Sequence, residues 1–201
     1  MIKIITQSDI LKHSDYLEEI RSIIKKGGVI IYPTDTLYGI GCDPFNLDAI
    51  RKIFKIKKRM ESKGLPILSD NLDNVKKIAK VPEIALQYIE RYWPGKLTII
   101  FESTGIVSPE VTGTLDTVAV RIPGNEFTLR LISECGGYLI GTSANESNKE
   151  VLKSITEIQD QISGDIDLII DAGPVKEILP STILDITSPV PKIIRKGAQD
   201  L

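Results

Sequence analysis

The sequence predicts an α/β fold, in which a twisted, mixed β-sheet is flanked by helices. Short runs rich in β-branched residues interleave with amphipathic helical segments, but without the strict strand–helix–strand rhythm of a barrel. Hydrophobic residues make up 42% and charged residues 26% of the chain, which is typical of a folded globular protein. No repeat, low-complexity tract or polar linker interrupts the 201 residues, so we predict one domain spanning residues 1–201.

The first elements follow from hydrophobic periodicity and from glycine and proline punctuation. A short strand is expected at residues 2–5, followed by a helix that continues to about residue 26 and ends at Gly27-Gly28. The apolar face of this helix has helical spacing and consists of Leu17, Ile20 and Ile24. Residues 28–33 then predict a buried strand that stops at Pro33.

The later elements alternate in the same way. Asn46 or Asp48 is expected to cap a helix that buries Ile50, Ile53 and Phe54. Three more helices are expected near residues 71–79, 82–92 and 126–135, and the Ser154-Ile-Thr-Glu157 capping box begins another. Runs of β-branched and apolar residues predict strands at 65–69, 97–101, 118–122, 138–141, 166–171, 182–186 and 191–195.

Composition excludes several classes of protein. A formal charge of −2 argues against a protein that mainly coats nucleic acid. No apolar run approaches the roughly 20 residues that span a bilayer. The N-terminus has no long apolar segment followed by a small-residue cleavage site, so no signal peptide is expected. We therefore expect a cytoplasmic protein with no membrane partner.

The sequence offers little for metal-based or nucleophilic catalysis. The two cysteines, Cys42 and Cys135, are far apart and lack Cys or His neighbours, so we interpret both as unreactive thiols. His13 is the single histidine and lies in a polar stretch, where a surface position is favoured over catalysis. A zinc site and a histidine-dependent triad are therefore not expected.

The common phosphate-binding fingerprints are also missing. No Gly-Lys-Ser/Thr sequence of a P-loop occurs. Gly39-Ile-Gly41 begins like a dinucleotide fingerprint, but Pro44 stands where the third glycine belongs. We interpret these two glycines as a tight turn.

Polar and basic residues nevertheless gather where predicted strands and helices end, which is where open α/β sheets bind ligands. Pro33 to Gly39 follows a buried strand, and its hydroxyls either bind a small polar substrate or satisfy their own turn. The basic run from Lys52 to Lys63 either grips phosphates or forms a solvated helix face. In the first case Lys57 and Arg59 would point to the same side.

Four further segments complete the pattern. Thr142-Ser-Ala-Asn145 suits either phosphate oxygens or a helix cap. Arg121 interrupts an apolar strand, where alternation places it on one face with Thr117 and Ala119. A buried arginine needs a partner, and an anionic ligand is one candidate. Polar or basic residues also follow apolar runs at Pro180-Ser-Thr182 and Arg195-Lys-Gly197.

Taken in order, these segments resemble the YrdC/Sua5 family, which includes the threonylcarbamoyl-AMP synthases. Matches run from about residue 19 to residue 198. The matching motifs are Pro33-Thr-Asp-Thr-x-Tyr-Gly-x-Gly-Cys42, Lys57-x-Arg59, Trp93-Pro-Gly-x-Leu-Thr98, Thr117-Val-Ala-Val-Arg-x-Pro123, Ser143-Ala-Asn145, Ser181-Thr-Ile-x-Asp185 and Arg195-x-Gly-Ala198. Their order and spacing are more specific than any one of them alone.

The resemblance implies a nucleotidyltransferase that makes threonylcarbamoyl-adenylate and pyrophosphate from L-threonine, bicarbonate or CO₂, and ATP with Mg²⁺. A partner transferase would then modify adenosine 37 of tRNA, and weak RNA binding is possible within this class. No prosthetic group and no protein metal site are expected. The resemblance is to the minimal form, without a further C-terminal domain, and implies a concave basic ligand face.

Site residues follow by matching positions, with no catalytic nucleophile among them. The threonine site would comprise Thr36, Arg121, Gly141 and Ser181. The ATP site would comprise Lys57, Arg59, Lys63, Thr117, Ser143, Asn145 and Arg195. Lys57 and Arg59 would contribute most through positioning and electrostatics.

The chain departs from the family pattern at several places. Met60 and Gly64 stand where proline is common, which predicts a looser loop after Arg59. Leu68 replaces a histidine that contacts threonine in many members. Asn148 replaces a glycine, and because asparagine tolerates a left-handed backbone the turn is expected to survive.

Two alternatives remain open at this stage. Leu68 and Gly64 would suit a YciO-like paralogue that keeps the nucleotide site without efficient synthesis of threonylcarbamoyl-adenylate. A basic concave face would also suit an RNA-binding module in rRNA or tRNA maturation, although a pI near 5.6 argues against it.

Overall fold

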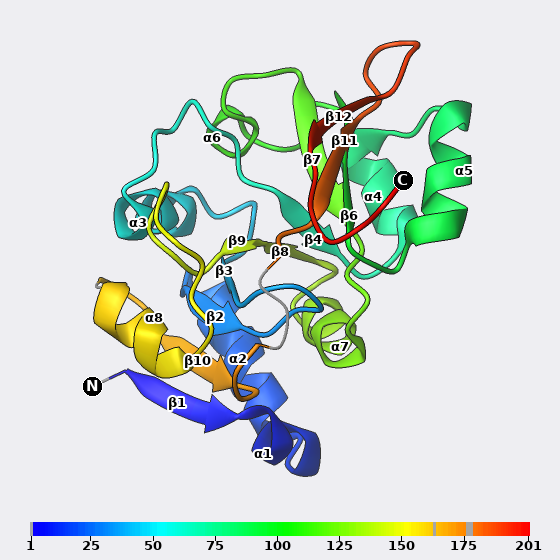
Figure 1. The fold of residues 1–201 in the computed structure, drawn as a ribbon. Helices are drawn as coiled ribbons and strands as arrows, with labels where there is room; N and C mark the ends of the chain where they lie inside the picture. The colour runs from blue at the N-terminus through cyan, green and yellow to red at the C-terminus, as the bar shows by residue number, and fades with distance from the viewer. Residues whose placement is uncertain (1, 163, 176–178) are drawn as a thin grey trace.

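The strands that the structure describes form two mixed sheets, one above the other in Figure 1. This computed structural model describes residues 2–162, 164–175 and 179–201. The first sheet has the strand order β1-β10-β2-β3-β9, and its first three strands run parallel. Its strands are β1 (Lys3–Thr6), β10 (Leu168–Asp171), β2 (Ile30–Tyr32), β3 (Gly39–Gly41) and β9 (Thr142–Ser143).

The second sheet has the order β12-β11-β6-β7-β4-β8, with β5 added along β6. Two of its pairings, β11 with β6 and β4 with β7, are parallel, and the others are antiparallel. The strands are β12 (Lys192–Arg195), β11 (Thr182–Asp185), β6 (Leu97–Ser103), β7 (Thr117–Arg121), β4 (Ile67–Ser69), β8 (Tyr138–Ile140) and β5 (Ala79–Lys80). The predicted fold class is confirmed, with the strands divided between two sheets.

The helices cover these sheets from both sides (Figure 1). They are α1 (Gln7–Lys12), α2 (Asp15–Lys25), α3 (Leu47–Lys57), α4 (Leu72–Ile78), α5 (Glu83–Tyr92), α6 (Pro109–Thr112), α7 (Glu126–Glu134) and α8 (Ile155–Gln161). Helices α2 and α7 contact each other and share one apolar core with β1, β2 and β10. Helices α3, α4, α5 and α8 share a larger core with β6 and β7.

Strand alternation explains why two cores form. Ile30 and Tyr32 face the core of α2 and α7, whereas Ile31 between them faces the larger core. Leu168, Ile169 and Ile170 divide in the same way. Because successive side chains of a strand point to opposite faces, an uninterrupted apolar run buries both faces of the sheet.

One long helix was expected near the N-terminus, and the structure has two. His13 leaves the helix with φ −128° and ψ 104°, its N–H bonding the carbonyl of Asp9. Helix α2 then begins at Asp15, where an acidic first turn favours a helix N-terminus. The predicted apolar face is confirmed, since Leu17, Ile20 and Ile24 are all buried.

The prediction of a tight turn at Gly39 and Gly41 is wrong. Both residues belong to β3, which pairs with β2 on one side and β9 on the other. A Cβ atom on Gly41 would lie 1.9 Å from the carbonyl oxygen of Ile140, and one on Gly39 would lie 3.1 Å from the ring of Tyr32. These glycines therefore permit a close approach to neighbouring groups.

Several local predictions are confirmed. The side chain of Asn46 caps α3 by accepting from the amide of Ala49 at 3.1 Å. Ser154 caps α8 through the amide of Glu157 at 3.2 Å, although the carboxylate of Glu157 accepts from Lys153 instead of closing the predicted box. None of the helices in residues 2–162, 164–175 and 179–201 combines the length and the apolar composition of a membrane span.

Candidate functional site

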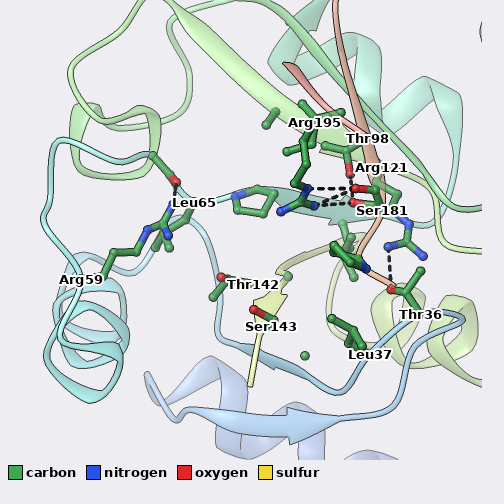
Figure 2. A pocket seen from close by; sticks show the side chains of 18 of the residues that line it. Thr36, Leu37, Arg59, Leu65, Thr98, Arg121, Thr142, Ser143, Ser181 and Arg195 are labelled. Atoms are coloured by element: carbon green, nitrogen blue, oxygen red, sulfur yellow. Dashed lines mark hydrogen bonds between the residues drawn. The ribbon is translucent and has the colours of Figure 1, made fainter. Parts of the chain in front are cut away.

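A cavity of about 370 Å³ lies between the two sheets, and strands of both contribute to its wall (Figure 2). Ten of the eleven predicted site residues line it. They are Thr36, Lys57, Arg59, Thr117, Arg121, Gly141, Ser143, Asn145, Ser181 and Arg195. Segments separated by up to about 160 positions in the chain therefore meet at one place.

The charges in the cavity wall have one sign. Lys57, Arg59, Arg121 and Arg195 line it, and no aspartate or glutamate is found among the described lining residues. Burial lowers the pKa of Arg195, and the nearby charges of Arg121 and Arg59 lower it further. Asp35 pairs with Arg121 from outside the lining, and the excess of basic groups in a partly enclosed cavity attracts anions.

Arg121 is the most deeply buried of the three arginines. It stands at the end of β7, on the same cavity-lining face as Thr117 and Ala119, as the alternation predicted. Its guanidinium donates from Nε to the carbonyl oxygen of Gly95 at 2.8 Å and from Nη1 to Thr36 Oγ1 at 3.1 Å. Nη2 forms an ion pair with Asp35. Burial lowers the pKa of Arg121, and Asp35 opposes this effect, so the group stays charged.

The loop before β3 combines both readings that the sequence left open. Thr34 serves its own turn, because its Oγ1 accepts from the amides of Thr36 at 3.1 Å and Leu37 at 3.2 Å. Asp35 and Thr36 instead meet Arg121. Thr34 therefore holds the turn and also lines the cavity together with Thr36, whereas Asp35 contacts Arg121 from outside the lining.

Ser181 lies between two neighbours in the same wall (Figure 2). Its carbonyl oxygen accepts from Arg195 Nε at 3.1 Å and Nη2 at 2.8 Å, and its Oγ lies 3.2 Å from the same Nη2. Its Oγ is also 2.8 Å from Oγ1 of Thr98. The sequence analysis did not select Thr98 as a site residue, although it is the last residue of the Trp93–Thr98 motif.

Lys57 is the last residue of α3 and is only 2% exposed. Its amine donates to the main-chain oxygens of Ser143 and Asn145, the latter at 2.7 Å. Burial, and secondarily the charge of Arg59, lowers the pKa of Lys57 to about 7. The alternative of a solvated helix face therefore describes Lys55 and Lys58, which are exposed, but not Lys57.

Arg59 lies in the segment that follows α3. It donates from Nε to the carbonyl oxygen of Lys63 at 3.0 Å and from Nη2 to that of Gly64 at 2.8 Å. Burial lowers the pKa of Arg59. Lys63 is the predicted residue that the structure does not bring to the cavity, since its side chain is exposed.

The loop that follows Arg59 has Met60 and Gly64 at the two positions where proline is common in the family. Met60 is exposed, and Gly64 lies against main chain, where an added Cβ would be 2.9 Å from the carbonyl oxygens of Val111 and Thr112. The amide of Leu65 donates to Val111 at 2.7 Å. A hydrogen bond to Val111 and close packing against the main chain of Val111 and Thr112 therefore hold the end of this loop, and its looseness stays a prediction.

The segment after β9 is cross-linked internally. Ser143 Oγ donates to Asn145 Oδ1 at 2.6 Å, and Asn145 Nδ2 donates to the carbonyl of Lys149 at 2.8 Å. The carboxylate of Glu146 bonds Lys58 and Lys149, each at 2.7 Å. Asn148 has φ +66°, so the predicted left-handed turn is confirmed.

Leu68 forms an apolar part of the wall. It is 3% exposed and pairs in register with Arg121 across β4 and β7, so their side chains stand beside each other. A Cβ on Gly141 would lie 2.3 Å from Cγ of Leu68, which explains why glycine occupies this position.

Two further predictions concern residues outside the cavity wall. His13 is exposed, as expected. Cys42 and Cys135 are free thiols, and burial raises the pKa of both, that of Cys135 to about 12. Both are therefore protonated and unreactive near neutrality. Among the described residues, no group of three or more His, Cys, Asp or Glu could hold a metal ion.

Comparisons with known proteins identify relatives that cover most of the chain. The chain is 34% identical over 179 residues to a threonylcarbamoyl-AMP synthase of Pyrococcus abyssi, covering 89% of the chain and 53% of the relative. It is 31% identical to a threonylcarbamoyl-AMP synthase of Vibrio vulnificus, covering 90% of the chain and 98% of the relative. The chain thus spans about half the length of the Pyrococcus and Bacillus relatives, 53% and 51%, and nearly all of the Vibrio protein.

Solved structures match at the level of the fold as well. The structure of P. abyssi Sua5 complexed with L-threonine superposes with a TM-score of 0.87 at 31% identity, covering 98% of this chain and 57% of that one. Escherichia coli YciO gives a TM-score of 0.85 at 26% identity, covering 94% and 92%. The family described as telomere recombination, comprising Sua5, YciO and YrdC, matches residues 22–197. From its sequence, its fold and the residues gathered in its cavity, the chain belongs to the Sua5/YciO/YrdC family.

Proposed function

We propose that this chain is a threonylcarbamoyl-AMP synthase, a nucleotidyltransferase that converts L-threonine, bicarbonate or CO₂, and ATP to threonylcarbamoyl-adenylate and pyrophosphate. The observation that carries the proposal is a cavity lined by three arginines and a lysine and, among its described lining residues, no carboxylate. The relatives named threonylcarbamoyl-AMP synthase and the threonine complex of a related structure support the same reaction.

The threonine subsite would lie around Arg121. Its guanidinium, the hydroxyls of Thr36 and Ser181, and the backbone at Gly141 line one cavity. An arginine offers two parallel donors to a carboxylate, and the hydroxyls offer further donors nearby. Gly95, Thr36 and Asp35 already accept from the three nitrogens of this guanidinium, so the substrate carboxylate would bind its remaining N–H groups.

The triphosphate would bind beside this subsite. Arg59 and Arg195 would contact phosphate oxygens, with Thr117, Ser143 and Asn145 as polar contacts in the same wall. Lys57 would act mainly through the loop that its amine holds. Lys63 stays in the proposal on the family resemblance alone, because its side chain lies outside the cavity.

In the proposed reaction, the threonine amine adds to the carbon of CO₂ and loses a proton, which gives a carbamate. A carbamate oxygen then attacks the α-phosphorus of ATP, and the bond to the β-phosphate breaks as pyrophosphate leaves. The protein's task is to hold two anions together and to stabilise charge on the phosphates. Holding reactants in place can contribute about 7–11 kcal/mol to the rate enhancement.

Mg²⁺ would enter as part of the ATP complex. The described lining residues supply hydroxyl, amide and main-chain oxygens and cationic groups, but no carboxylate. Such a donor set suits a magnesium ion that is bound mainly by the phosphates. The unstable product would be taken over by a transferase that modifies adenosine 37 of tRNA. We place this reaction in the cytoplasm.

The decisive experiment is pyrophosphate release from ATP and Mg²⁺, with threonine and bicarbonate added or withheld separately. The proposal expects release that depends on both. Pyrophosphate release that depends on neither substrate, or no release although ATP binds, would favour a YciO-like role. Two observations favour the YciO-like role as the second candidate. Leu68 lines the proposed threonine subsite, and the chain is 26% identical to YciO, covering 92% of that protein.

An RNA-binding module is the remaining alternative and is tested by thermal protection. A ligand at 100 times its Kd should stabilise the protein by about 2.7 kcal/mol. We expect ATP with threonine to protect at moderate ionic strength, whereas phosphate-driven RNA binding should weaken steeply with added salt. Strong, salt-resistant protection by RNA would instead support the module.

A further inference from the structure

The Trp93–Thr98 motif lies directly behind two proposed threonine ligands. Trp93 Nε1 donates to the carbonyl of Leu97 at 2.6 Å, which ties the two ends of the motif together. The carbonyl oxygen of Gly95 accepts from Arg121 at 2.8 Å. Thr98 is 3% exposed and lines the cavity, with Oγ1 2.8 Å from Oγ of Ser181 (Figure 2). The motif thus contacts both Arg121 and Ser181.

The hydrogen bonds around Ser181 depend on which hydroxyl donates. A hydroxyl has one proton to donate and can accept two hydrogen bonds. Arg195 Nη2 donates to Ser181 Oγ at 3.2 Å. If Thr98 also donates to Ser181, both acceptor positions are filled, and the proton of Ser181 is left for a ligand. If Ser181 donates to Thr98 instead, Ser181 has no proton to offer.

An anionic ligand selects the first arrangement. A carboxylate accepts hydrogen bonds and donates none, so it needs the Ser181 proton to point toward it. Ser181 is 8% exposed and Thr98 is 3% exposed, so a wrongly directed proton is costly at either position. Since Arg195 can only donate to Ser181, Thr98 must be the second donor if the Ser181 proton is to be free for the ligand.

We infer that Thr98 is a positioning residue that directs the hydroxyl proton of Ser181 toward the carboxylate of the amino-acid substrate. The inference rests on the proposed function, because it takes Ser181 as part of the threonine subsite. It assigns Thr98 a role through Ser181 and not by contact with the substrate.

The test compares the KM values for threonine and ATP in Thr98→Val, which keeps the shape and removes the hydroxyl, and in Thr98→Ser, which restores the hydroxyl. A lost hydrogen bond worth about 1.4 kcal/mol corresponds to roughly tenfold. We expect Thr98→Val to raise the KM for threonine about that much, to change the KM for ATP less than twofold, and to be rescued by Thr98→Ser.

A double-mutant cycle separates positioning from direct contact. Because Thr98 acts through Ser181, Ser181→Ala and Ser181→Ala/Thr98→Val should have the same KM for threonine. Thr104→Val makes the same change at a threonine outside the cavity wall, whose hydroxyl donates to the carbonyl of Lys77 at 2.8 Å. The KM for threonine of this control variant should equal that of the unmodified protein.

Three results would overturn the inference: Thr98→Val with an unchanged KM for threonine, additive effects in the double variant, or no rescue by serine. These failures are distinct from failure of the proposed function. The latter would appear in the unmodified protein, as pyrophosphate release that does not depend on threonine.

Discussion

Lys57 donates two hydrogen bonds to main-chain oxygens of a distant segment, those of Ser143 and Asn145. The amide of Ser147 returns a hydrogen bond to the carbonyl of Lys57 at 2.9 Å. The end of α3 and the loop after β9 are therefore held together at the cavity. A lysine whose motif suggests a phosphate contact uses two of its N–H groups to position polar residues of the wall.

Replacement of Lys57 should test this role. Lys57→Met keeps much of the aliphatic volume and removes both donors, so we expect a loss of about 2–4 kcal/mol in the free energy of unfolding. The KM for ATP should also rise, because Ser143 and Asn145 lose their anchor. Chemical denaturation and steady-state kinetics measure the two effects. Normal stability with a raised KM would instead indicate direct contact with ATP.

The lowered pKa of Lys57 predicts a pH dependence of stability. Its pKa falls from the usual 10.5 to about 7 in the folded protein, mainly because of burial. Between these values the unfolded chain holds a proton that the folded chain has released, so this group's contribution to stability rises with pH. The slope can reach roughly 1.4 kcal/mol per pH unit. Below pH 7 the contribution should be flat.

Urea denaturation of the unmodified protein and of Lys57→Met from pH 6 to pH 10 would measure that contribution. The stability difference in favour of the unmodified protein should grow above pH 7. A difference that stays constant across the range would mean that Lys57 titrates normally.

Arg59 and Lys63 should differ in importance. Arg59 lines the cavity, whereas the side chain of Lys63 is exposed outside it. Arg59→Ala should raise the KM for ATP by roughly ten- to a hundredfold, the effect of losing a charge-assisted contact. Lys63→Ala should raise it less than threefold, because a charge contact made by an exposed side chain is weak. Equal effects of the two substitutions would show that Lys63 reaches the nucleotide in the complex.

Leu68 should influence the threonine subsite, because it stands beside Arg121 in the register of β4 and β7. Leu68→His adds a polar group there and should lower the KM for threonine roughly fivefold, at a cost of about 1–3 kcal/mol for partial burial of the imidazole. Leu68→Met conserves volume and serves as the control. If Leu68→His raises that KM while Leu68→Met does not, the wall at position 68 faces the methyl group of the substrate.

Gly41 should tolerate no side chain. An added Cβ would lie 1.9 Å from the carbonyl oxygen of Ile140, so Gly41→Ala should force the sheet apart and lose several kcal/mol, on the order of 3 or more. Gly105→Ala is the matched control. Its site is open with φ +86°, where only about 1 kcal/mol of backbone strain is expected. Similar melting temperatures for the two variants would contradict the close approach.

The sequence alone predicted the fold class and most elements, because these depend on local patterns. The apolar face of α2, the Asn46 cap and the alternation of Thr117, Ala119 and Arg121 are all properties of a few neighbouring residues. The family motifs also selected ten residues that line one cavity, since their order along the chain is specific.

Tertiary contacts decided what local patterns could not. Gly39 and Gly41 were predicted to form a turn. The reason for glycine at these positions is the close approach of Tyr32 and Ile140, which belong to other strands. The role of Lys57 depends on carbonyl oxygens 86 and 88 positions away, and the place of Thr98 depends on Ser181, 83 positions away. The propensity of a residue is local, whereas burial and hydrogen-bond partners arise only when distant segments pack together, so the direction of each polar group in the cavity is set by the fold.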